Sequence, residues 1–186
     1  MDLTEKEIKK FWADKLAADE RIRKRNKRHK EIVDLFNSSK LTTLQPLWHT
    51  EIDSIDLNKQ NENLNADLLE DGFTILHNID IEFLFDKMYP GNPEMFREKN
   101  LYNKELDDLK ISGVIDNWFK NVKLIPPTIL VINNTNYVFP TDGKHRINVA
   151  YYFGATTLPI FVINKQLDKI KSILNLNDTE KSNNGC

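Results

Sequence analysis

Tyr137-Val-Phe-Pro-Thr-Asp-Gly-Lys-His-Arg146 is the most informative stretch of this 186-residue chain. Its β-branched and aromatic residues predict a strand, and its Asp-Gly pair predicts a tight turn. The residues that follow, Ile147 to Phe153, predict a short helix that ends at Gly154, and Leu158 to Ile163 predict another strand. The turn from Asp142 to Arg146 therefore lies between a strand and a helix, and we take it as the candidate site.

The start of the predicted helix favours an anion. N–H groups in the first turn of a helix have no acceptor inside the helix, and this end carries partial positive charge. Gly143, Lys144, His145 and Arg146 would place backbone donors, an ammonium group, an imidazole and a guanidinium around one small volume. A phosphate group is the simplest ligand for this set.

Asp142 ends the predicted strand, and three roles are open to it. It could hold a magnesium ion, accept a proton from a substrate hydroxyl, or orient Arg146 or His145. The whole turn also has a structural alternative, in which Asp142 and Gly143 form an ordinary turn, Lys144 is exposed and Arg146 pairs with a surface acid.

The segments on either side of the turn predict a small α+β domain. Two strand-like runs around Asn133-Asn-Thr predict a β-hairpin that leads into the turn. Helical periodicity over Lys104 to Phe119 ends before the Pro126-Pro127 pair. The remaining expected elements are a strand over Phe73 to His77, a helix over Ile81 to Met88 and a last helix over Leu167 to Leu174.

Residues 4 to 36 contain neither glycine nor proline and carry apolar residues at helical spacing. This pattern predicts one long helix, or two helices with a break near Ala17 to Glu20. Thr4 and Glu7 fit a capping box at its start. Three tryptophans fall in apolar patterns and are assigned to the core: Trp12, Trp48 and Trp118.

The middle of the N-terminal helix is strongly basic, because Arg21 to Lys30 contains seven Lys or Arg and no acid. Such a run must face water or an anionic partner, and a nucleic-acid backbone would release counterions on contact. The alternative is a solvated face balanced by the acids nearby. The candidate nucleic-acid contacts are Arg21, Arg23, Lys24, Arg25, Lys27 and Arg28.

Four regions are expected along the chain. Residues 1 to 36 form a basic N-terminal helical extension, 37 to 70 an acidic connector, 71 to 174 the main domain, and 175 to 186 a disordered tail. Cys186 is the single cysteine, so no disulfide can form within the chain. The chain shows neither a membrane-spanning apolar run nor a secretion signal at its start, so we expect a cytoplasmic protein without a membrane partner.

The order of these features resembles the core of the ParB/sulfiredoxin superfamily. The hairpin, the Asp142-Gly-Lys-His-Arg146 turn, the short helix ending at Gly154 and the strand beginning Leu158-Pro follow one another as in that family, over about residues 114 to 163. The resemblance implies a ParB/sulfiredoxin-like small mixed sheet flanked by helices, with an N-terminal helical extension. It also implies a nucleotide or phosphate site on Gly143, Lys144, His145 and Arg146.

Members of the superfamily use this core differently. Sulfiredoxins place a catalytic Cys where this chain has Lys144, so sulfinic acid reduction is not expected. Chromosome-partitioning members add a downstream helix-turn-helix domain, whereas only a short helix and a polar tail are expected after Ile163. Free serine kinases resemble this chain in their Asp-Gly-His-His-Arg segment and use an upstream Glu as base. Glu94 is the candidate for that base, with Glu98 and Glu82 as nearby alternatives.

The resemblance implies three functions. The first is phosphoryl transfer or NTP hydrolysis with Mg²⁺ and ATP, ADP or CTP, in which Asp142, His145 and Glu94 are catalytic and Asp142 holds the metal. The second is a ParB-like DNA-binding protein or nuclease that also uses the basic helix. The third is a nucleotide-sensing interaction module without turnover.

Overall fold

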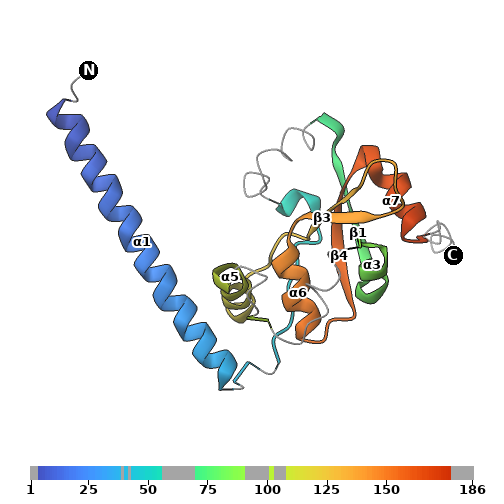
Figure 1. Ribbon diagram of the computed structural model, residues 1–186, viewed down its shortest axis with the longest axis horizontal. Helices are drawn as coiled ribbons and strands as arrows, with labels where there is room; N and C mark the ends of the chain where they lie inside the picture. Colours follow the sequence, from blue (N-terminus) through green and yellow to red (C-terminus); the bar gives the residue numbers. More distant parts are fainter. Residues whose placement is uncertain are drawn as a thin grey trace.

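The computed structural model describes residues 4–38, 40–41, 43–55, 70–90, 101–102 and 108–176. Over these residues the protein is an α+β structure with a four-stranded mixed sheet and five α-helices. A long N-terminal helix, α1 (Glu5–Asn37), projects away from the sheet (Figure 1). The expected α+β class and the helical extension are therefore confirmed.

The sheet has the strand order β1-β4-β2-β3. β2 and β3 form the expected antiparallel hairpin, β4 runs parallel to β2, and β1 pairs antiparallel with β4 at the other edge. Every residue of the central strand β4 after Thr157 is buried. The strands are β1 (Phe73–Asp80), β2 (Thr128–Val131), β3 (Val138–Asp142) and β4 (Thr157–Ile163).

β1 continues three residues beyond the predicted end at His77. Asn78 has a φ of 54°, and the register with β4 shifts between Leu76 and Ile79. Asparagine tolerates this left-handed conformation better than most residues. The shift sends Ile75 and Ile79 into different core clusters, although residues four apart in a regular strand share one face.

Three short helices build the larger core on one face of the sheet. They are α3 (Ile81–Lys87), α6 (Lys144–Tyr152) and α7 (Leu167–Ile173). Phe85 of α3, Ile147 of α6 and Ile170 of α7 are fully buried in the same cluster as the inward residues of β4. The bounds of these helices agree with the predicted ones to within a few residues at each end.

A second core joins α6 to the end of α1 through α5 (Asp108–Phe119). Trp118 of α5 is 2% exposed, and its Nε1 donates to the carbonyl of Leu47 at 2.9 Å. Trp48 packs edge-on against Trp118, with ring centroids 5.1 Å apart. Leu44 is buried in this core as well, so the first part of the expected connector packs on the domain.

α1 is a single helix without a break near Ala17, and its capping box between Thr4 and Glu7 is present. Only its last third packs on the domain, where Ile32 is fully buried. Trp12 is 53% exposed, so its assignment to the core is wrong. Helical periodicity reveals an apolar face but not whether another element covers it. No helix in the described ranges is long and apolar enough to cross a membrane.

A half-buried ion pair fixes α1 on α5. The Arg28 Nε and Nη2 atoms donate to Asp116 Oδ1 at 2.8 and 2.5 Å, and Nη1 donates to Glu31 at 2.9 Å. Lys120 donates to the other carboxylate oxygen of Asp116 at 2.8 Å. Burial alone would raise the pKa of Asp116, but the hydrogen bonds from Arg28 and Lys120 outweigh it and lower the pKa. The two hydrogen bonds that Arg28 donates to Asp116 explain the fixed direction of α1.

We expect Asp116→Asn to lower the free energy of unfolding by about 1–2 kcal/mol, because it removes the charge that faces Arg28 across a partly exposed contact. Chemical denaturation at neutral pH measures this difference. Glu20→Gln is the matched control, since it removes an exposed pair with Lys24 on the same helix. We expect this control to change stability by less than about 0.5 kcal/mol.

The lowered pKa of Asp116 also predicts a pH dependence of stability. A carboxyl group whose pKa is lowered on folding stabilises the protein above its unfolded pKa, and this stabilisation is lost as the pH falls through the folded pKa. The difference between wild type and Asp116→Asn should therefore be constant near neutral pH and shrink below about pH 3.9. A difference that persisted in acid would show that the charge of Asp116 is not its source.

Candidate functional site

The candidate turn forms the start of α6, as predicted. Gly143 is the N-cap residue with a φ of 90°, and it provides no side-chain cap for the helix. Its carbonyl accepts the hydrogen bond from the Ile147 N–H at 3.0 Å. The earlier N–H groups of the first turn have no acceptor within the helix, so this end of α6 has the geometry of an anion site.

Glycine is required at position 143 for two reasons. The left-handed φ is unfavourable for residues with a side chain. A Cβ atom at this position would also lie 2.7 Å from the Cα and Cβ atoms of Pro127 and 2.9 Å from the Arg146 Nη2 atom. The turn therefore packs directly on the residue before β2, and this contact fixes where α6 begins.

Asp142 and Arg146 form an ion pair across the turn. The Arg146 Nη2 atom donates to Asp142 Oδ2 at 2.7 Å, and the two side chains are 16% and 34% exposed. Among the three roles open to Asp142, this contact matches the one in which Asp142 orients Arg146. A planar guanidinium held in this way presents its remaining N–H groups in a fixed direction.

Polar atoms without a protein partner cluster around this turn. Across the described ranges, the buried side-chain nitrogen and oxygen atoms with no hydrogen-bond partner are Thr128 Oγ1, Arg146 Nε and both amide atoms of Asn148. Arg146 and Asn148 belong to α6, and Thr128 is the strand partner of Asp142. Buried polar groups are nearly always satisfied by protein, water or ligand. Their concentration here marks the turn as a place where a polar ligand would be stabilised.

A pocket of about 310 Å³ opens beside the turn. Asp142, Gly143, His145 and Arg146 line one side of it, and α5 contributes Lys110, Gly113, Val114 and Asn117 to the other. Its lining therefore includes three basic side chains and one acid. Lys144, by contrast, is not among the lining residues, and its Nζ atom lies 4.7 Å from the centre of the Phe139 ring.

Sequence reasoning missed Lys110 and Asn117. The two are seven residues apart on α5 and so share one face of the helix, which is the available sequence signal. Only the packing of α5 against α6 brings that face to the turn. The Asn117 amide donates to the Gly113 carbonyl at 2.8 Å, which leaves its oxygen available as an acceptor.

Of the other proposed acids, only Glu82 lies within the described residues. Glu94 and Glu98 lie outside the described residues. Glu82 accepts a short hydrogen bond from the Tyr151 hydroxyl. Within the described part of the chain, no three His, Cys, Asp or Glu residues form a group that could hold a metal ion. Among the described residues, Asp142 is the only carboxylate that lines the pocket.

Most of the basic run is exposed on α1. Arg21 to Lys27 are all exposed, whereas Arg28 is occupied by its contacts with Asp116 and Glu31. Arg28 thus serves to dock α1, which differs from its expected role as a nucleic-acid contact. His29 also turns inward, and its Nδ1 atom lies 2.7 Å from the Ser112 hydroxyl. Ser112 is 3% exposed, and its contact with His29 ties α1 to α5.

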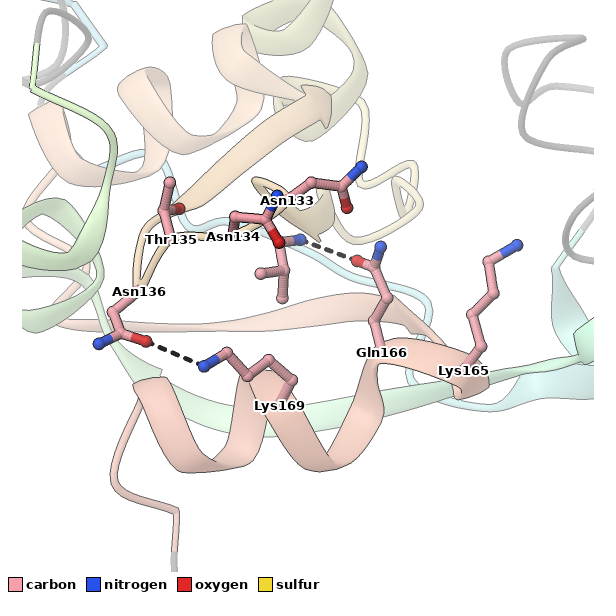
Figure 2. A pocket seen from close by; sticks show the side chains of 8 residues that line it. Asn133, Asn134, Thr135, Asn136, Lys165, Gln166 and Lys169 are labelled. Atoms are coloured by element: carbon pink, nitrogen blue, oxygen red, sulfur yellow. Dashed lines mark hydrogen bonds between the residues drawn. The ribbon is translucent and has the colours of Figure 1, made fainter.

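Another pocket, of about 500 Å³, lies between the β2–β3 turn and the start of α7 (Figure 2). Its polar groups mainly hold these elements together. Gln166 accepts from the Val131 N–H at 2.8 Å, Lys169 donates to Asn136 at 2.9 Å, and Lys165 pairs with Asp71 at 3.0 Å. Among the described residues that line it, no buried polar side-chain atom lacks a hydrogen-bond partner. We therefore take the smaller pocket beside Gly143 as the functional candidate.

No family model matches this chain, and no curated protein or solved structure matches it either.

We expect Gly143→Ala to lower the free energy of unfolding by at least about 2 kcal/mol, because the added Cβ meets backbone at a left-handed φ. Gly113→Ala is the matched control. Gly113 lies within α5 with nothing close to an added Cβ, so alanine should stabilise the helix by about 0.5–1 kcal/mol. Thermal or chemical unfolding of both variants measures the contrast. Equal stability of the two would contradict the close approach of Gly143 to Pro127.

Proposed function

We propose that this protein binds a nucleotide or another phosphorylated ligand at the turn from Asp142 to Arg146 and acts as a phosphotransferase or NTPase. The observation that carries the proposal is the guanidinium of Arg146. Asp142 holds one end of it, and its buried Nε has no protein acceptor beside an uncapped helix start. Both features favour an anion with several oxygens.

Each group around the pocket has a role in this binding. The first N–H groups of α6 and the guanidinium of Arg146 donate to phosphate oxygens, and Lys110 adds positive charge from the opposite side. Asn117 supplies a neutral amide to the pocket. Burial strengthens these interactions because water screens them less than at an open surface.

A ParB/sulfiredoxin-like fold is part of the proposal. The hairpin, the glycine turn, the short helix and the following strand occur in the order that the family resemblance requires. Lys144 stands in place of the cysteine of sulfiredoxins, so the proposed chemistry is phosphate transfer and not redox repair. Histidine is the side chain that most often transfers protons in enzymes, so His145, which lines the pocket, is a candidate for this role, and Glu94 stays a candidate base.

The residues present fit a phosphate better than a metal held by protein. Asp142 offers one carboxylate, and one of its oxygens already accepts from Arg146. Mg²⁺ is commonly held by one or two carboxylates together with the phosphates of a nucleotide, so Asp142 alone would supply the protein ligand. The ion would neutralise charge on ATP, ADP or CTP, while Arg146 and α6 orient the phosphates.

We expect Arg146→Ala to raise the Kd for the bound nucleotide by at least about tenfold, because a charged two-pronged contact is lost. Arg146→Lys should restore little, since lysine keeps the charge but lacks the planar fork. Calorimetry with ATP, ADP and CTP, with and without Mg²⁺, measures the effect. Lys144→Ala is the control, and it should bind nearly as wild type because Lys144 does not line the pocket. Full affinity in Arg146→Ala would contradict the assigned site.

Turnover separates the enzyme from a nucleotide-sensing module that uses the same pocket. Release or transfer of phosphate by the wild type, reduced in His145→Gln and Glu94→Gln while binding persists, would support catalysis. Tight binding without any turnover across a panel of hydroxyl acceptors would favour the sensing module instead.

A specific observation also favours nucleic-acid binding as a second candidate function. Arg21, Lys24 and Lys27 follow one another at spacings of three, so they lie along one side of α1, and all are exposed. α1 projects from the domain, which leaves this basic side accessible along its length (Figure 1). Lys24 pairs with Glu20 at 2.8 Å, an exposed contact that a phosphate could replace.

We expect the triple variant Arg21→Ala, Lys24→Ala, Lys27→Ala to weaken DNA or RNA binding and to reduce the slope of log K against log salt by roughly 2 to 3. The triple variant Lys6→Ala, Lys9→Ala, Lys10→Ala is the control from the same helix outside the run. Fluorescence anisotropy over a salt series measures both. Unchanged affinity and slope in the first variant would exclude the basic run as a nucleic-acid contact.

A further inference from the structure

The N-terminal part of α1 carries an exposed apolar stripe that the fold does not use. Phe11, Trp12 and Leu16 are 60%, 53% and 68% exposed, which is unusual for three large apolar side chains so close together. The ring centroids of Phe11 and Trp12 lie 5.7 Å apart in an edge-on arrangement. The members of this arm stripe are Ile8, Phe11, Trp12, Leu16 and Ile22.

The spacing of the arm stripe is that of a helix-pairing seam. Ile8, Trp12, Lys15, Asp19 and Ile22 recur at alternating intervals of four and three residues. The same series continues through His29 to Phe36, where α1 packs on α5. α1 therefore uses the end of this face to pack on a helix within the chain and leaves the rest exposed.

Two charged residues within the seam indicate the partner. Lys15 lies on the stripe, since its Nζ atom is 5.0 Å from the centre of the Trp12 ring. Asp19 is one turn further along the same face. A partner helix must therefore offer an acid opposite Lys15 and a base opposite Asp19, because a buried charge without a partner is strongly unfavourable.

We propose that two copies of this chain pair through the arm stripe as antiparallel helices. In the register that places Trp12 opposite Ile22 of the second copy, Lys15 lies opposite Asp19, and the two-fold axis repeats both contacts. Leu16 then contacts Leu16 of the second copy at one side of the seam. A single arrangement thus covers the exposed apolar side chains and neutralises both charges of the seam.

Other partners satisfy the stripe less well. A parallel pair in register would place Lys15 against Lys15 and Asp19 against Asp19, which repel each other. A lipid surface would cover the aromatic residues but would offer no base to Asp19. A nucleic acid would repel Asp19 and would leave the large aliphatic side chains in water. The basic side with Arg21, Lys24 and Lys27 lies away from the stripe and stays accessible in the antiparallel pair.

Sedimentation equilibrium of the full chain over a concentration series tests the proposal. We expect a monomer–dimer equilibrium for the wild type. Its Kd should rise on the order of 100-fold in the double variant that carries both Phe11→Gln and Leu16→Gln, because two apolar contacts are lost in each copy. The matched control is the double variant Lys10→Gln, Lys24→Gln, which lies on the opposite side of α1 and should dimerise as the wild type does. Far-UV circular dichroism should show the same helix content in all variants, since these side chains are exposed.

A charge-reversal cycle tests the register. Lys15→Asp and Asp19→Lys each bring like charges together twice and should weaken dimerisation on the order of tenfold, whereas the combined variant should recover wild-type affinity. Leu16→Cys in a Cys186→Ser background should form a disulfide-linked dimer, and Ala13→Cys should not. A wild type that stays monomeric, a monomer that binds anionic lipid vesicles through the stripe, or a reversal cycle without recovery would overturn the proposal.

Discussion

The close approach of Gly143 to Pro127 is the constraint on which the site depends. Because the turn lies against the residue that precedes β2, the end of β3 and the start of α6 occupy fixed positions relative to the hairpin. That placement lets Asp142 reach Arg146 across one turn of helix. It also places Gly143, His145 and Arg146 against the pocket beside α5. One backbone contact without a side chain therefore fixes where the turn and the start of α6 lie in the candidate site.

The ion pair at this turn and the one on α1 illustrate two uses of the same chemistry. Arg28 makes three charged hydrogen bonds to acids of α5 and α1, so its donors are largely consumed in holding two helices together. Arg146 gives one donor to Asp142 and keeps a buried Nε without a protein acceptor. A guanidinium with most of its donors paired is structural, whereas one with donors to spare in a pocket is suited to recognition.

The local elements could be predicted from sequence because glycine, proline and asparagine mark their ends. The hairpin, the turn at Asp142-Gly143 and the helices around it agree closely with expectation. The assignment of Trp12 to the core was wrong, because helical spacing identifies an apolar face but not whether another element covers it, and Trp12 is 53% exposed. In the site, Asp142 to Arg146 are local in sequence and could be found, whereas Lys110 and Asn117 arrive by packing between helices and could not.

The unbroken course of α1 has a geometric consequence. A continuous helix rises about 1.5 Å per residue, so the part of α1 before Arg28 reaches about 35 Å from the point where it docks. A flexible chain of the same length would spread its end over many positions and directions. α1 is instead a stiff spacer whose direction is set where its last third packs on the domain, so a partner bound at its tip is held at a defined distance from the sheet.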